Sequence, residues 1–205
     1  MRHTGIVDRG AWLFAYGSLV APAEARRTLG VAPEARPATV HGLARGWWVG
    51  TAGRSYRCGR CGRRQAVAVV LGCLPLDGAR TAGVLLRVDS RGRRLLDRRE
   101  ASYAPLALDP RAVEAHGGTP RGAPVMTYTP LPDRLRDAHR PGAAVPAVYE
   151  RTVEDAFAAA WRHAGDGRAA FRATTAASDL PRRADLTYAG PDPDRGAPPC
   201  ACPGP

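Results

Sequence analysis

Short apolar runs typical of β-strands fill the first two thirds of this 205-residue sequence, and its clearest helix comes after them. The run at residues 66–74 is almost continuously apolar, which is typical of a central strand, and Asp77-Gly78 predicts a turn after it. Further strands are predicted at residues 12–16, 40–43, 47–49, 81–88, 104–108 and 125–129. Strands first and helices last favour an α+β domain, and we expect a small β-barrel with helices packed around it.

Helices are predicted at residues 22–29, 91–101, 152–164 and 171–177. In the third of these, Thr152 and Asp155 have the spacing of a capping box, and Val153, Ala156, Phe157, Ala160 and Trp161 recur on one face.

The segments between the predicted strands and helices are rich in turn-forming residues. We interpret residues 50–65 as an exposed loop or hairpin tip and residues 109–124 as a loop. From residue 179 onward the chain is rich in proline, glycine, aspartate and arginine. We therefore expect one domain at residues 1–178 and a disordered tail at residues 179–205.

The chain carries a formal net charge of +11, which by itself favours nucleic acid as a partner. All thirty basic residues are arginine, which together with abundant alanine and proline indicates a coding bias, and the arginines are scattered. We therefore do not expect specific nucleic-acid binding. No run approaches eighteen apolar residues, and residues 1–10 lack the apolar centre of a signal peptide. A cytoplasmic protein without a membrane partner is expected.

The turn after the first predicted strand is a candidate binding site. Tyr16, Gly17, Ser18 and Leu19 lie between a buried strand and a predicted helix. Amides at a helix N-terminus lack partners inside the helix, and glycine lets the backbone approach a ligand closely. The alternative interpretation is an ordinary strand-to-helix turn.

Glu100 is a candidate acid–base residue. It lies four residues after Leu96, so a helix places both on one face, which we expect to turn toward the interior. Asp97 is expected to point outward, beside Arg93 and Arg94. A glutamate in apolar surroundings has a raised pKa, which suits it to proton transfer near neutrality. The alternative is a solvated helix face with Glu100 paired to an arginine.

Together these segments resemble the gamma-glutamylcyclotransferase superfamily. The resemblance rests on FAYGSL at residues 14–19, TAGVLLRV at 81–88 and LLDRREASY at 95–103, in that order. A later Pro-x-x-Tyr element, residues 146–149, is also similar, and the resemblance extends from residue 12 to about residue 165.

The resemblance implies a small mixed β-barrel with flanking helices, no metal and no organic cofactor. It implies that the backbone amides of the turn from Tyr16 to Leu19 hold a gamma-glutamyl group. Glu100 then takes a proton from the substrate α-amino group, and the freed amine closes a ring to give 5-oxoproline and a released amine or amino acid. Tyr103 and Tyr149 become secondary pocket residues, although both also fit as core aromatics. Ala101 follows Glu100 where glutathione-specific members have glycine, which argues against glutathione as substrate.

The cysteines leave a second possibility open. Cys58 and Cys61 have the spacing of half a zinc knuckle, and only Cys200 and Cys202 are available as a second half. A redox role is less favoured because this pair does not open a helix after a strand. Cys73, inside an apolar run, is interpreted as core.

Three functions therefore remain in view. The first is a cyclotransferase for a small gamma-glutamyl substrate. The second removes a gamma-glutamyl protecting group during the assembly of a secondary metabolite. The third is a non-catalytic protein that binds an acidic partner through the same pocket or through an arginine-rich, zinc-clasped loop.

Overall fold

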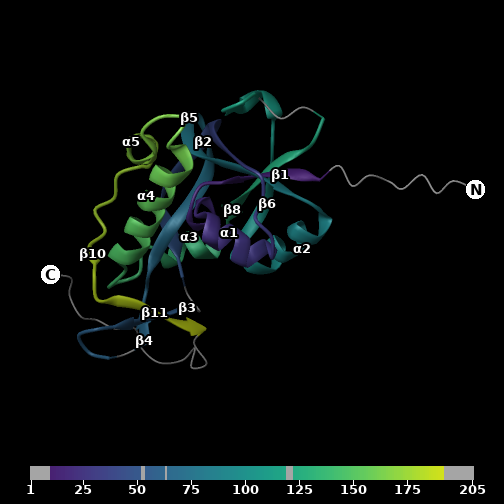
Figure 1. The fold of residues 1–205 in the computed structure, drawn as a ribbon. Helices are drawn as coiled ribbons and strands as arrows, with labels where there is room; N and C mark the ends of the chain where they lie inside the picture. The colour runs from purple at the N-terminus through teal and green to yellow at the C-terminus, as the bar shows by residue number, and fades with distance from the viewer. Residues whose placement is uncertain (1–9, 52–53, 63, 119–121, 192–205) are drawn as a thin grey trace, which may run out of the picture.

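The structure is a computed structural model that describes residues 10–51, 54–62, 64–118 and 122–191 (Figure 1). Its main element is a six-stranded mixed sheet with strand order β6-β8-β1-β5-β2-β7. The strands are β1 (Ala11–Ala15), β2 (Ala35–Gly50), β5 (Val69–Val88), β6 (Tyr103–Leu108), β7 (Val113–Ala115) and β8 (Val125–Pro130). β1 lies inside the sheet, antiparallel to β5 and parallel to β8. The predicted α+β class is confirmed.

The long strands β2 and β5 form an antiparallel pair that carries most of the sheet. The prediction of two strands separated by a turn at Asp77-Gly78 is wrong, because β5 continues through these residues. The pairing passes from Arg80 opposite His41 to Pro75 opposite Leu43, so residues 76–79 bulge out of register without reversing the chain. The predicted strands at residues 40–43 and 47–49 are likewise parts of one strand, β2.

The sheet does not close into the barrel that we expected. Over the described residues its edges are β6 and β7, at opposite ends of the strand order. The first half of β5 instead meets β8 and β6 through side chains: Thr129 Oγ1 donates to the carbonyl of Cys73 and Tyr103 Oη to that of Leu71, each at 3.0 Å. The sheet is therefore curled, and side-chain contacts replace the backbone ladder that a closed barrel needs.

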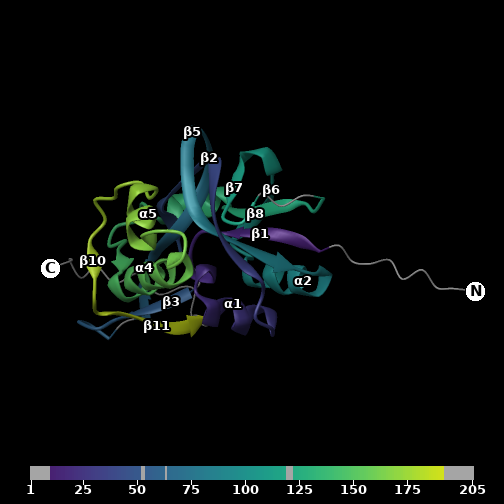
Figure 2. The same ribbon diagram turned by 45° about the horizontal axis from the view of Figure 1, so that its top comes forward.

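The helices form two groups (Figures 1 and 2). α1 (Pro22–Leu29) and α2 (Ser90–Arg99) lie together near β1, whereas α4 (Ala147–Trp161) and α5 (Gly167–Ala173) lie beside the β2–β5 pair. The short helices are η1 (Ser18–Val20), η2 (Pro110–Ala112) and α3 (Pro132–Asp137). α1 has its predicted bounds and ends at Gly30, whose φ of 76° suits glycine.

α4 begins earlier than the capping-box pattern predicts. Its N-cap is Pro146, and the Thr152 hydroxyl bonds back to the carbonyl of Val148 at 2.8 Å inside the helix. The predicted core face is confirmed for Val153, Ala156 and Phe157, which are buried. α5 begins and ends four residues earlier than predicted, after Asp166, whose carboxylate accepts from the amide of Ala169 at 3.1 Å.

A second, smaller sheet has the order β11-β3-β4, and β9 (Val145–Pro146) pairs with β10 (Arg182–Arg183). β3 (Arg54–Cys58) and β4 (Arg64–Ala66) are antiparallel, which confirms the hairpin expected within residues 50–65. β10 and β11 (Leu186–Pro191) fall within the segment expected to be a tail, so strand structure extends beyond residue 178. The division at residue 178 stays a prediction. None of the helices in the described ranges has the length and apolarity that a membrane crossing needs.

Candidate active site

An open pocket lies where β1 runs into η1. It encloses about 390 Å³ of space, including its mouth. Its lining comprises residues 13–19, Leu71, Glu100, Tyr103, Tyr128 and Tyr149. The structure thus brings together in one pocket all seven residues proposed from the sequence: Tyr16, Gly17, Ser18, Leu19, Glu100, Tyr103 and Tyr149.

The turn at residues 16–19 leads directly into the short helix η1. Gly17 is its N-cap, and the first amides of a helix have no acceptor within the helix. A Cβ on Gly17 would lie 3.3 Å from Tyr149 Oη, so the glycine allows the close approach of this tyrosine. The expected α-helix follows as α1, two residues after η1 ends.

Tyr16 anchors the turn through its side-chain hydroxyl. Its hydroxyl donates to the carbonyl of Tyr128 at 2.8 Å. Burial raises the pKa of Tyr16 well above its usual value, with nearby ionisable groups adding to the effect. The phenol is therefore neutral at working pH, and its proton is committed to a backbone carbonyl.

Glu100 is the C-cap of α2, and its amide donates to the carbonyl of Leu96 at 2.8 Å. Leu96 is fully buried, and the Glu100 side chain is only 16% exposed, so the inward orientation predicted from their spacing is confirmed. Glu100 Oε1 also lies 3.0 Å from Arg99 Nε. Glu100 lines the pocket and is also paired to an arginine, as the alternative interpretation expected, but its side chain does not lie on a solvated helix face. Its acid–base role stays a prediction.

Arg99 joins three parts of the site. Its guanidinium donates to Glu100, to Ser18 Oγ at 3.0 Å and to Thr28 Oγ1 at 2.6 Å, and it lies 3.4 Å from Glu24 of α1. The sequence gave no reason to select this arginine among thirty. The one sequence feature that could have pointed to Arg99 is its position directly before Glu100.

Three tyrosines besides Tyr16 line the pocket. Tyr103 donates to the carbonyl of Leu71, and the ring of Tyr149 packs edge-on against Trp47 with centroids 6.1 Å apart. Tyr128, which sequence reasoning missed, donates to Asp97 Oδ1 at 2.6 Å. Burial, followed by this contact with Asp97, raises the pKa of Tyr128.

Asp97 points outward beside Arg93, as predicted, and the structure adds Tyr128 as a partner. The hydrogen bond from Tyr128 is the main reason that the pKa of Asp97 is lowered, and Arg93 adds to it. Tyr128 thereby connects the C-terminal half of α2 to Tyr16, whose hydroxyl donates to its carbonyl.

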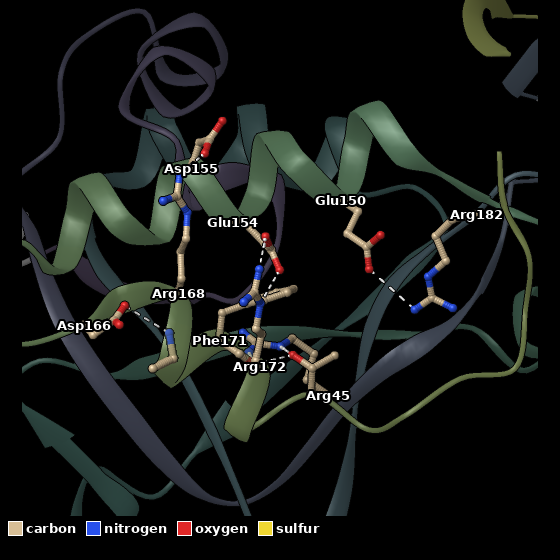
Figure 3. Close-up of polar contacts among 11 residues, drawn as sticks. Arg45, Glu150, Glu154, Asp155, Asp166, Arg168, Phe171, Arg172 and Arg182 are labelled. Carbon is tan, nitrogen blue, oxygen red and sulfur yellow. Dashed lines mark hydrogen bonds and ion pairs between the residues drawn. The ribbon is translucent and has the colours of Figure 1, made fainter. Parts of the chain in front are cut away.

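Arg45 of β2 supports the turn from the side of α5 and is 1% exposed. It donates to the carbonyls of Tyr16 at 3.2 Å, Ala82 at 2.7 Å and Phe171 at 2.7 Å. Burial lowers the pKa of Arg45 to about 10, which leaves the guanidinium charged at neutral pH. Figure 3 shows Arg45 next to Phe171, below three carboxylates of α4 that face arginines of the following segment. These ion pairs are Glu150–Arg182, Glu154–Arg172 and Asp155–Arg168.

None of the three described cysteines, Cys58, Cys61 and Cys73, lines the pocket. Cys58 is buried and accepts a hydrogen bond from Arg183 at 2.9 Å, and Cys61 is exposed. Cys200 and Cys202 lie outside the described residues, so the zinc clasp stays a prediction. The described ranges hold no cluster of three or more potential metal ligands from His, Cys, Asp and Glu. Burial raises the pKa of the Cys73 thiol to about 12, in keeping with a core residue.

Comparison with known proteins shows the class of fold. No family model and no curated protein matches the sequence. Among solved structures, YkqA from Bacillus subtilis aligns with a TM-score of 0.55 and 20% identity over 85% of this chain and 56% of its own. An uncharacterized Homo sapiens protein, loc79017, aligns with a TM-score of 0.54 and 10% identity over 91% of this chain and 95% of its own.

A gamma-glutamyl cyclotransferase aligns with a TM-score of 0.51 and 10% identity over 86% of this chain and 95% of its own. The chain therefore has a gamma-glutamylcyclotransferase-like fold, as the sequence motifs predicted. It spans little more than half the length of YkqA.

Proposed function

We propose that this protein is a cyclotransferase that converts a gamma-glutamyl amine or peptide to 5-oxoproline and the free amine. The observation that carries the proposal is the shared pocket of Glu100 and the turn at residues 16–19. A largely buried carboxylate and the backbone amides of the turn, both on one small cavity, fit the two needs of this reaction, a base and oxyanion donors.

In the proposed mechanism, Glu100 acts first as a base. The α-ammonium of a gamma-glutamyl group is protonated near neutrality and cannot attack until it loses a proton. We assign this proton transfer to Glu100, whose carboxylate lines the pocket and lies 3.0 Å from the guanidinium of Arg99. The same carboxyl group then returns the proton to the departing amine.

Backbone amides of the turn stabilise the charge that develops on the gamma-carbonyl oxygen. The amides of Ser18 and Leu19 begin η1 and have no acceptor within that helix, so they are suited to receive the oxyanion. Ring closure joins two ends of one molecule, so the main task of the pocket is to hold the substrate folded. Tyr103 and Tyr149 supply its walls, and this chemistry requires no metal or organic cofactor.

A substrate panel tests the proposal. Purified protein is incubated with gamma-glutamyl amines, gamma-glutamyl dipeptides and glutathione, and 5-oxoproline is quantified by mass spectrometry. The matching α-glutamyl compounds are the control, because the amine of an α-linked residue does not face a gamma-amide. We expect 5-oxoproline from at least one gamma-glutamyl compound and none from its α-isomer. Tight binding across the panel without any turnover would favour a non-catalytic binding protein instead.

A further inference from the structure

Within the described residues, Arg99 is the one residue of α2 whose side chain donates hydrogen bonds both to Glu100 and to the turn at residues 16–19. Nε donates to Glu100 Oε1 at 3.0 Å and Nη2 to Ser18 Oγ at 3.0 Å. Nη1 donates to Thr28 Oγ1 at 2.6 Å and lies 3.4 Å from Glu24 Oε2. All three nitrogens of one planar group are thus bound to groups on α1, η1 and the end of α2.

A guanidinium suits this arrangement better than an ammonium would. Its five N–H groups lie in one plane at fixed angles, so a single side chain sets the relative positions of several acceptors. The contacts are also sheltered, since the side chain of Arg99 is 20% exposed and that of Glu100 is 16% exposed. Hydrogen bonds to charged groups in such surroundings are stronger than those on an open surface.

The two helices also make apolar contact with each other. Leu96 of α2 and Leu29 of α1 are buried, and a Cβ on Gly92 would lie 3.2 Å from Leu29 Cδ2, which shows how closely the helices approach. Apolar contact therefore holds α1 against α2. The hydrogen bonds of Arg99 set the distance between the carboxylate of Glu100 and the turn at residues 16–19.

We propose that Arg99 is a positioning residue, which holds Glu100 and the Ser18 end of the turn at the separation that a bound gamma-glutamyl group requires. This inference rests on the proposed function. Misplacing a reacting group by a fraction of a bond length lowers the rate of a chemical step more than it weakens substrate binding. The loss on removing Arg99 should therefore appear mainly in kcat.

The test compares Arg99→Gln, Arg99→Lys and Arg99→Ala with Arg98→Gln, which alters the adjacent, exposed arginine. For Arg99→Gln we expect kcat/KM for 5-oxoproline release to fall by roughly 10- to 100-fold, mostly in kcat. Arg99→Lys should recover little of this loss, because an ammonium cannot reach all the acceptors. Millimolar guanidinium chloride should restore part of the rate of Arg99→Ala and leave Arg98→Gln unchanged. Thermal unfolding of each variant shows whether it is folded.

A second arm probes the contact with the turn alone. Ser18→Ala removes one acceptor and leaves the Arg99–Glu100 pair in place, so it should lower kcat/KM less than Arg99→Gln does. The inference is overturned if Arg99→Gln retains the kcat of Arg98→Gln, or if guanidinium fails to rescue folded Arg99→Ala. A wild-type protein that releases no 5-oxoproline overturns the proposed function, and this inference falls with it.

Discussion

Gly17 and Tyr149 both line the pocket and lie so close together that adding one methyl group at residue 17 tests their contact. A Cβ at residue 17 would lie 3.3 Å from Tyr149 Oη, closer than most real Cβ contacts. We expect Gly17→Ala to lower kcat/KM by about tenfold, because the turn or the tyrosine must shift. Steady-state kinetics with thermal unfolding measures this. In the double variant Gly17→Ala/Tyr149→Phe the hydroxyl is gone, and part of the activity should return. An unchanged kcat/KM in the single variant would contradict the assigned contact.

Sequence reasoning found those site residues that belong to recognisable motifs. A glycine after a buried strand and a glutamate four residues after a leucine made Tyr16 to Leu19 and Glu100 candidates. The resemblance of both segments to one superfamily then selected them over an ordinary turn and a solvated helix face. Tyr128 and Arg99 carry no such signal. One lies in an ordinary strand, and the other is an arginine in a chain with thirty of them. Their roles depend on contacts between segments far apart in the sequence.

Arg45 connects β2 to α5 and to the turn, and this makes it the main polar support of the site. Its removal leaves the buried carbonyls of Tyr16, Ala82 and Phe171 without this donor. The carbonyl of Phe171 keeps Thr175 Oγ1 as a donor at 2.6 Å. Each buried acceptor left unsatisfied costs about 1–3 kcal/mol, so we expect Arg45→Met to lower the free energy of unfolding by about 2 kcal/mol or more. Urea unfolding measures the change.

Arg36→Met is the matched control for Arg45→Met, because Arg36 also lies on β2 but pairs with the exposed Glu34. We expect this control to lower the free energy of unfolding by about 1 kcal/mol or less. Equal losses in the two variants would show that the hydrogen bonds of Arg45 are not the source of its effect.

The bounds of α1 were predicted accurately from local signals, whereas the turn predicted at Asp77-Gly78 was wrong. α1 starts at Pro22 and ends at Gly30, both of which act within a few residues. Asp77-Gly78 looks like an equally local signal, yet β5 passes through it because the long partner strand β2 accommodates a bulge there. Only the identity of the pairing partner decides between a turn and a bulge, and the local sequence does not specify it.

The chain as a whole combines the curled main sheet with a small sheet formed by segments far apart in the sequence. β11 pairs with β3 in the order β11-β3-β4, and no described residue of these three strands lines the pocket. The main sheet is open, which motifs could not reveal, because closure depends on whether edge strands meet. Likewise, the late pairing of β11 with β3 has no local signature in the proline- and glycine-rich segment that contains it.

A variant that ends after Asp185 therefore tests whether the pocket depends on the small sheet. The change removes β11 and leaves β3 with β4 as its partner, so we expect trypsin to cleave at Arg54 and Arg57 sooner than in the full chain. The rate of 5-oxoproline release should stay close to that of the full chain. Limited proteolysis followed by mass spectrometry, together with the activity assay, checks both points. A loss of turnover would show that the small sheet supports the pocket.

The central claim is that Glu100 moves the proton in a reaction held by the turn at residues 16–19. Glu100→Gln keeps the shape of the side chain and removes its ability to act as a base. General acid–base groups contribute about 10²–10⁴-fold to rates, so 5-oxoproline release should fall by that factor while the thermal unfolding temperature stays close to that of wild type. Glu34→Gln, which alters an exposed glutamate, should retain the wild-type rate. Equal rates for Glu100→Gln and Glu34→Gln on an active substrate would contradict the account.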